Sequence, residues 1–210
     1  MTYKHFLFDL DGTLTDPALG ITNSILYAME KFGLEKVARE QLYCFIGPPL
    51  LDMFCSQFGV SREESQTMLT LYREYFSQKG LFENKVYDGV AETLAALKER
   101  GAKLYLASSK PEIFVKQILA HFKLDQYFSF IGGSTMEETR TKKEDVIAYV
   151  MEEGKVPKEG TLMVGDRLYD IEGAHANGIA AAGVLFGYGN CEELKDAEHI
   201  LEKFEDLLNL

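Results

Sequence analysis

The feature that most constrains the fold is an alternation of short apolar runs with helix-length segments. The apolar runs lie at residues 6–10, 103–107, 128–131, 162–164 and 180–185. Runs of this length suit buried strands, and parallel strands need long crossover connections that usually contain a helix. The sequence therefore predicts an α/β fold, with a Rossmann-like parallel sheet as its core and helices on both faces.

Three of the connecting segments have the apolar spacing of amphipathic helices. The first covers residues 89–100 and ends before Gly101, and the second covers residues 111–121 and opens with a proline, which suits a first helical turn. The third covers residues 143–153 and places Val146, Ile147 and Val150 on one face. These helices are expected to pack against the sheet.

Residues 16–83 interrupt the alternation, because the pattern there predicts helices and no strand. A first helix is expected to start at Asp16 as N-cap and to end at Gly33. Two more are expected near residues 40–45 and 49–58, and a fourth after the capping box at residues 61–64. The sequence therefore predicts an inserted, all-helical cap domain at 16–83 and a core made of residues 1–15 and 84–210.

Composition limits the kind of protein. The chain has 210 residues, of which 46% are hydrophobic and 26% charged, as in an ordinary globular protein with one sizeable core. No apolar run approaches the length of about 18 residues that spans a bilayer, and the N-terminus lacks the pattern of a secretory signal. We therefore expect a cytoplasmic protein without a membrane partner.

Charge and cysteine content exclude further classes. A formal net charge of −11 argues against a nucleic-acid partner, and it requires local cations and N–H groups wherever an anionic substrate binds. The three cysteines have no CxxC spacing, which argues against a disulfide framework or a zinc site and is typical of a reducing compartment. The sequence makes no prediction of oligomeric state.

The chemistry is concentrated in the string DLDGTLT at residues 9–15, directly after the first apolar run. Gly12 indicates a tight turn at the end of this strand. The turn is expected to direct Asp9 and Asp11 toward the carboxyl edge of the sheet, where doubly wound folds bind their ligands.

This string resembles motif one of the haloacid dehalogenase superfamily phosphatases, and three further motifs follow in the expected order. Ser108 is similar to the serine or threonine of motif two, and Lys143 resembles the lysine of motif three, with Lys142 as the alternative. The segment GDRLYD at residues 165–170 resembles motif four. The helical insert with its Gly-Pro-Pro loop resembles the phosphoglycolate phosphatase subgroup.

The resemblance implies a magnesium-dependent phosphatase with Asp9 as nucleophile. Mg²⁺ would be ligated by Asp9, the main-chain carbonyl of Asp11 and Asp166, with Asp170 acting through a water molecule. Such a cation is physically necessary, since a carboxylate and a phosphate at about 4 Å repel by about 4 kcal/mol at an effective dielectric constant of about 20. Mg²⁺ accepts both carboxylate and phosphate oxygens as ligands.

The remaining motif residues have expected roles around the phosphate. Asp11 is interpreted as the general acid that protonates the leaving group and then as the base for water. Ser108 and Lys143 are expected to hold the phosphoryl oxygens. Ser109 and Lys110, expected at the start of the next helix, would add polar contacts.

Several functions remain open on these residues. The first is hydrolysis of a small phosphorylated metabolite, such as phosphoglycolate or a sugar phosphate. The alternatives are a phosphomutase similar to β-phosphoglucomutase, and a nucleotidase or pyrophosphatase. A non-catalytic sensor of phosphorylated metabolites is a third class, against which the presence of both Asp9 and Asp11 argues.

Overall fold

The computed structural model describes residues 2–137 and 139–210. The chain forms two compact units, one made of Met1–Asp16 together with Val86–Leu210 and the other of Pro17–Lys85. Two strands of two residues each, β2 (Thr15–Asp16) and β3 (Lys85–Val86), lie where the chain passes from one unit to the other. The assignment of the second unit as a cap stays a prediction.

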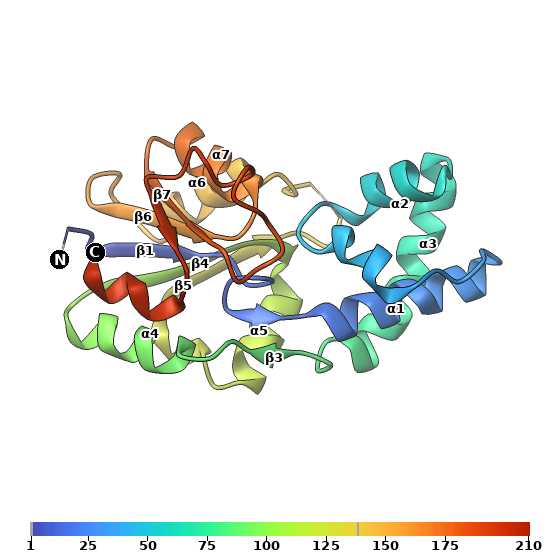
Figure 1. Cartoon of the computed structure of the whole chain (residues 1–210), viewed down its shortest axis with the longest axis horizontal. Helices are drawn as coiled ribbons and strands as arrows, with labels where there is room; N and C mark the ends of the chain where they lie inside the picture. Colours follow the sequence, from blue (N-terminus) through green and yellow to red (C-terminus); the bar gives the residue numbers. More distant parts are fainter. Residues whose placement is uncertain (1, 138) are drawn as a thin grey trace. The chain divides into compact units, whose positions relative to one another are not determined.

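The first unit is built on a six-stranded sheet in the order β5-β4-β1-β6-β7-β8 (Figure 1). The strands are β1 (His5–Phe8), β4 (Lys103–Pro111), β5 (Phe128–Ser134), β6 (Thr161–Gly165), β7 (Ala180–Val184) and β8 (His199–Leu201). All neighbouring strands pair in parallel. The predicted parallel sheet is confirmed, whereas β8 was not predicted, because its three residues include an exposed Ile200 and form no apolar run.

Helices cover both faces of this sheet, as predicted. On one side lie α6 (Lys143–Glu153) and α7 (Leu168–Ala176), and on the other α4 (Val90–Glu99) and α5 (Glu112–His121) (Figure 1). Successive residues of β1 point to opposite faces, so that Leu7 packs in the cluster formed with α6 and α7. Phe8 instead approaches Phe204, with ring centroids 5.7 Å apart. Two short 3₁₀ helices, η3 (Asp125–Tyr127) and η4 (Phe204–Asn209), complete the unit.

The second unit consists of helices over its described residues 17–84. They are α1 (Ala18–Phe32), η1 (Arg39–Phe45), α2 (Leu50–Phe58), α3 (Arg62–Tyr75) and the π-helical turn η2 (Phe76–Gly80). The predicted capping box is present, because the Ser61 hydroxyl accepts from Glu64 N–H and the Glu64 carboxylate accepts from Ser61 N–H. None of the helices in the described part of the chain has the length and apolar character needed to cross a bilayer.

The expected role of Asp16 as the N-cap of the first helix is wrong. Pro17 occupies that position, and no side chain caps the helix. The Asp16 carboxylate instead accepts a hydrogen bond from the hydroxyl of Tyr188, far away in the sequence. A tertiary partner has therefore taken the side chain that a local pattern assigned to the helix terminus.

Candidate active site

The proposed site residues lie where three neighbouring strands end. Asp9 directly follows β1, Asp166 directly follows β6, and Ser108 lies toward the end of β4. Because β1 lies between β4 and β6 and pairs in parallel with both, the three positions share one edge of the sheet. The sheet register thus brings together residues that are up to 157 positions apart in the sequence.

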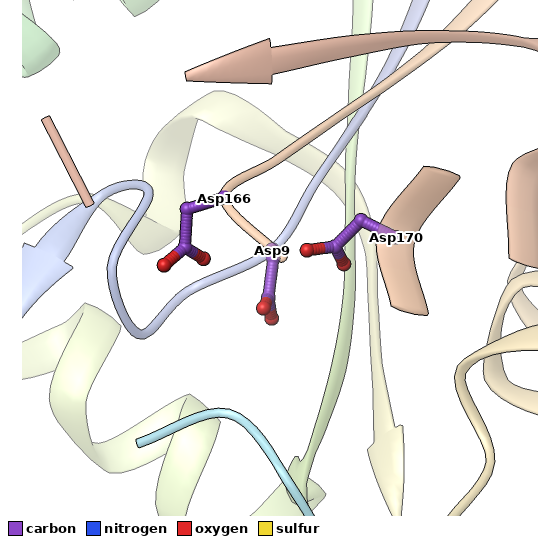
Figure 2. Close-up of side chains that lie close together, drawn as sticks. All are labelled: Asp9, Asp166 and Asp170. Carbon is purple, nitrogen blue, oxygen red and sulfur yellow. The ribbon is translucent and has the colours of Figure 1, made fainter. Parts of the chain in front are cut away.

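Three buried carboxylates form a cluster at this edge (Figure 2). Asp9, Asp166 and Asp170 each offer one oxygen atom, and these atoms lie within 4.8 Å of one another. The three residues are only 5%, 1% and 0% exposed. Burial raises the pKa of Asp166 well above its usual value, and the negative charges of Asp170 and Asp9 raise this pKa further.

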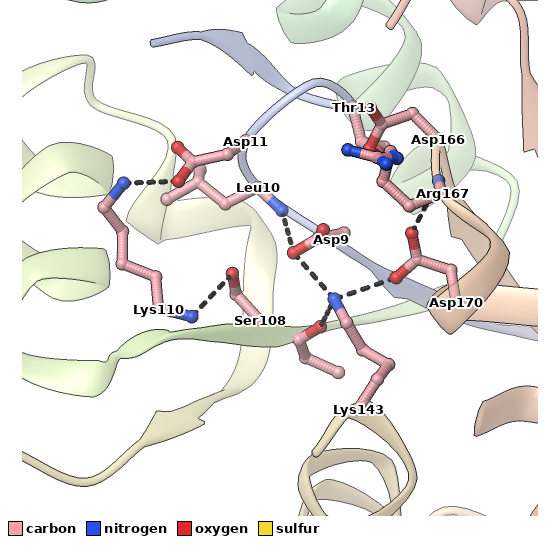
Figure 3. A network of polar contacts seen from close by, with 11 residues as sticks. Asp9, Leu10, Asp11, Thr13, Ser108, Lys110, Lys143, Asp166, Arg167 and Asp170 are labelled. Atoms are coloured by element: carbon pink, nitrogen blue, oxygen red, sulfur yellow. Dashed lines mark hydrogen bonds and ion pairs between the residues drawn. The ribbon is translucent and has the colours of Figure 1, made fainter. Parts of the chain in front are cut away.

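Lys143 lies beside this cluster and partly neutralises it (Figure 3). Its Nζ is 2.9 Å from Asp9 Oδ1 and 2.8 Å from Asp170 Oδ1, and it donates to the main-chain carbonyl of Ala107 at 3.2 Å. Burial alone would lower the pKa of Lys143, but the two carboxylates outweigh burial and raise it. For the carboxyl group of Asp170, burial acts in the opposite direction. It raises the pKa of Asp170 to about 6, against the opposing effect of Lys143.

The turn after β1 packs its backbone closely against Asp166. Gly12 has a φ of 86°, a left-handed conformation that favours glycine. A Cβ atom at this position would lie 2.1 Å from Asp166 Oδ2, so a side chain would collide with the carboxylate. Gly12 is therefore required both by the backbone conformation and by the packing against Asp166.

Asp11 lies in the same turn but has a different set of contacts. Its Oδ2 is ion-paired with Lys110 Nζ, and the two side chains are only 11% and 7% exposed (Figure 3). Its buried Oδ1 has no hydrogen-bond partner among the described residues. Burial raises the pKa of Asp11, although Lys110 opposes this shift. Asp11 is thus a buried carboxyl group of raised pKa that pairs with a lysine through one of its two oxygens.

With this geometry established, comparison with known proteins identifies the family. The family model described as haloacid dehalogenase-like hydrolase matches residues 6–184, which include all of the predicted site residues. The chain belongs to the haloacid dehalogenase-like hydrolases. The resemblance predicted from the four motifs is thereby confirmed, and the chain is an enzyme of a hydrolase family.

Similar proteins of this family include both curated and solved examples. A 5′-nucleotidase from Pseudomonas aeruginosa is 43% identical over 93% of this chain and 88% of its own. Phosphoglycolate phosphatase 1 from the same organism is 29% identical over 96% of this chain and 77% of its own. The crystal structure of a predicted phosphatase from Clostridium acetobutylicum is 44% identical, with a TM-score of 0.95 and complete coverage of both chains.

The structure of this haloacid dehalogenase-like hydrolase separates the two candidate lysines of motif three. Lys143 begins α6 and is 7% exposed, with its side chain directed to Asp9 and Asp170. Lys142 precedes the helix and its side chain is 74% exposed. Its Nζ lies 3.8 Å from Glu144 Oε1. Lys143 is thus the lysine at the site, where it contacts the carboxylates of Asp9 and Asp170 and the main-chain carbonyl of Ala107.

The second motif lies differently from expectation. Ser109 and Lys110 were expected at the start of a helix, but β4 continues through Pro111 and α5 begins at Glu112. The physical reason is that a residue before proline disfavours the helical conformation, so Lys110 stays extended. Ser108 is 2% exposed and its hydroxyl accepts from the Lys110 N–H at 3.4 Å, whereas Ser109 is half-buried.

Sequence reasoning missed a loop of this hydrolase that contacts Asp166. The main-chain N–H of Tyr188 donates to Asp166 Oδ2 at 2.8 Å, and the Thr13 hydroxyl donates to Asp166 Oδ1 at 3.4 Å. Tyr188 stands between Gly187 and Gly189. This pair of glycines after a strand was the available signal, because closely spaced glycines often allow backbone to approach a functional group.

Proposed function

We propose that this chain is a Mg²⁺-dependent phosphatase of small phosphomonoesters, with Asp9 as the nucleophile. The observation that carries the proposal is the cluster of Asp9, Asp166 and Asp170 at the sheet edge, with their ligand atoms within 4.8 Å of one another. These three carboxylates, the ammonium group of Lys143 and the carboxyl group of Asp11 would supply what phosphoryl transfer to a carboxylate requires.

The donor set fits a magnesium ion. Mg²⁺ prefers oxygen ligands, and the cluster consists of buried carboxylates whose mutual repulsion raises the pKa of Asp166. Asp9 and Asp166 would hold the ion together with the main-chain carbonyl of Asp11, and Asp170 would act through a water molecule. When bound, the ion neutralises the negative charge that otherwise makes the Asp9 carboxylate repel a phosphate group.

Asp9 is oriented for attack by its own contacts. Its Oδ1 accepts from the Leu10 N–H at 2.7 Å and pairs with Lys143 at 2.9 Å. Both of these contacts involve Oδ1. In the proposed first step a carboxylate oxygen of Asp9 forms a bond to phosphorus while the bond from phosphorus to the ester oxygen breaks.

Asp11 is proposed to move the protons of both steps. In its acid form it gives its proton to the departing ester oxygen, and its raised pKa favours that form. In the second step it accepts a proton from the water that attacks the phosphoryl group on Asp9, which releases inorganic phosphate and restores the Asp9 carboxylate. Ser108 and Ser109 are proposed to donate hydrogen bonds to the phosphoryl oxygens.

Lys143 is proposed to act in the same site. Its contacts indicate a second role besides the phosphate binding expected from the motif. It pairs with Asp9 and Asp170, so it holds the nucleophile in place as well as supplying positive charge near a phosphoryl oxygen.

The helical unit of residues 17–85 is proposed as the cap, and its closure would exclude bulk water from the reaction.

Two substrate classes are proposed for testing. Phosphoglycolate and sugar phosphates follow from the motifs and from the relative named phosphoglycolate phosphatase. Nucleoside 5′-monophosphates are the second class, favoured by the 43% identity to a protein named 5′-nucleotidase. Both classes present a phosphomonoester on a small molecule and require the same chemistry at Asp9.

A phosphate-release screen tests the proposal. The purified protein is assayed with a panel of 2-phosphoglycolate, hexose phosphates, pyrophosphate and nucleoside 5′-monophosphates, with Mg²⁺ and with a chelator. We expect Mg²⁺-dependent release that falls by at least about a thousandfold in Asp9→Asn, since removal of a covalent nucleophile has effects of this order. Undiminished turnover in Asp9→Asn would contradict the proposed nucleophile.

The same assay separates hydrolysis from isomerisation. A phosphomutase would convert one hexose phosphate into another and release little inorganic phosphate, whereas a phosphatase would release one phosphate for each substrate consumed. Product analysis of the hexose phosphate reactions therefore decides between the two.

A cytoplasmic location stays a prediction of the sequence.

A further inference from the structure

The loop after β7 presses its backbone against Asp166. A Cβ atom at Gly187 would lie 2.3 Å from the Cβ of Asp166, and one at Gly189 would lie 1.9 Å from the Asp166 carbonyl oxygen. Contacts this short exclude any side chain at either position. The two glycines thereby allow the main chain of Tyr188, which stands between them, to reach the carboxylate.

Tyr188 makes the shorter of the two hydrogen bonds to the Asp166 carboxylate. Its N–H donates to Oδ2 at 2.8 Å, whereas the Thr13 hydroxyl donates to Oδ1 at 3.4 Å. Asp166 is 1% exposed, so bulk solvent does not substitute for these donors. A hydrogen bond to a buried charged group is strong and directional. The position of the Tyr188 N–H therefore determines how the carboxylate of Asp166 is turned.

Two contacts anchor this loop at distant points of the same unit. The hydroxyl of Tyr188 donates to Asp16 Oδ1. The ring of Tyr87 packs edge-on against Phe186 of the loop, with centroids 5.1 Å apart. Asp16 is the last residue of this unit before the chain enters the helical unit, and Tyr87 is the second residue after the chain has returned from it.

We infer that Tyr188 is a positioning residue for the cation-binding carboxylate of Asp166. Its hydroxyl, held by Asp16, fixes the loop so that its main-chain N–H keeps Asp166 Oδ2 in the orientation that binds the ion. This inference rests on the proposed function, because it assumes that Asp166 ligates a divalent cation. Outer contacts of this kind commonly change metal affinity by 10- to 100-fold.

The test is the affinity for Mg²⁺ in Tyr188→Phe, measured by titration calorimetry without substrate. The substitution removes the hydroxyl and keeps both the ring and the main-chain N–H. We expect the dissociation constant for Mg²⁺ to rise about tenfold. The concentration of Mg²⁺ that gives half-maximal activity should rise in parallel, and saturating Mg²⁺ should restore kcat, which a general loss of folded protein would not allow.

Tyr105→Phe is the matched control. It also removes a tyrosine hydroxyl hydrogen bond of the same unit, the one at 3.4 Å to His5 Nδ1, and has no contact with Asp166 among the described interactions. Asp16→Asn is the second variant and should raise the dissociation constant less, by about threefold, since its amide oxygen still accepts from the Tyr188 hydroxyl but carries no charge. It preserves the test if Tyr188→Phe does not fold.

The outcomes are distinguishable. An affinity for Mg²⁺ in Tyr188→Phe and Asp16→Asn that equals that of Tyr105→Phe would overturn the positioning role while leaving the proposed function intact. A wild-type protein that binds no Mg²⁺ and releases no phosphate from any substrate would overturn the proposed function, and the positioning role with it.

Discussion

Replacement of Asp166 by asparagine should stabilise the ion-free protein while it removes the affinity for Mg²⁺. Asp166 is 1% exposed, and its ligand oxygen lies within 4.8 Å of those of Asp9 and Asp170. An asparagine has nearly the same shape and retains an oxygen that accepts the Tyr188 N–H. The substitution therefore removes one negative charge and leaves the packing nearly unchanged.

The magnitude follows from the charges around Asp166. Two carboxylates 4.8 Å apart repel by about 3.5 kcal/mol at an effective dielectric constant of about 20. Lys143 is paired with both Asp9 and Asp170 and cancels about one of their two negative charges. Proton uptake by Asp166, whose pKa is raised, limits the remaining cost. We expect a gain of about 2 kcal/mol, or about 4–8 °C in Tm for a chain of this length.

The assay is thermal unfolding of both proteins, followed by circular dichroism, in a chelator and in saturating Mg²⁺. In the chelator Asp166→Asn should unfold at the higher temperature. In Mg²⁺ the wild type should gain about 2.7 kcal/mol at a concentration 100 times the dissociation constant, and the variant should gain nothing. The order of the two unfolding temperatures should therefore reverse when Mg²⁺ is added.

The pH dependence has a definite sign. The folded pKa of Asp166 is raised above the usual value of 3.8, so its protonated form is the one that favours folding. The ion-free wild type should have this stability in full below that usual value and lose it as the pH rises through the folded pKa. Asp166→Asn should lack this decline. An ion-free variant that is less stable than the wild type near neutral pH would refute the reasoning.

Two further substitutions test the neighbouring groups. Asp11→Asn should lower kcat by about 10²- to 10⁴-fold and remove one limb of the pH–rate profile, and a profile identical to that of the wild type would exclude Asp11 as the acid and base. Lys143→Met should destabilise the protein by about 3–5 kcal/mol in chemical denaturation, because it leaves Asp9 and Asp170 buried without their cation. Lys142→Met is the matched control and should change stability by less than about 0.5 kcal/mol, since that side chain is exposed, and equal effects of the two substitutions would contradict the assignment.

Local sequence pattern was sufficient for most of the first unit. The apolar runs became β1, β4, β5, β6 and β7, because a buried parallel strand requires a short and nearly continuous apolar stretch. The segment from residue 143 to 153 forms the helix α6 with the predicted bounds. The edge strand β8 was missed, because half-exposed residues at an edge carry no such pattern.

The candidate site was predicted in part for a similar reason. Asp9, Asp11, Asp166 and Asp170 follow the ends of strands, and parallel topology alone brings such positions to one edge. The hydrogen-bond and ion-pair partners of these residues were harder to predict from the sequence. The ion pair of Asp11 with Lys110 depends on the continuation of β4 through Pro111, which the apolar pattern did not indicate.

The sequence by itself determined the strand and helix pattern, the family and the acidic residues of the candidate site, because each of these depends on residues close together in the chain. Only the tertiary structure decided that Lys143 rather than Lys142 faces the carboxylates, and that Tyr188 bonds to both Asp166 and Asp16. These contacts join residues up to 172 positions apart, and they depend on how β1, β6 and β7 lie side by side in the sheet.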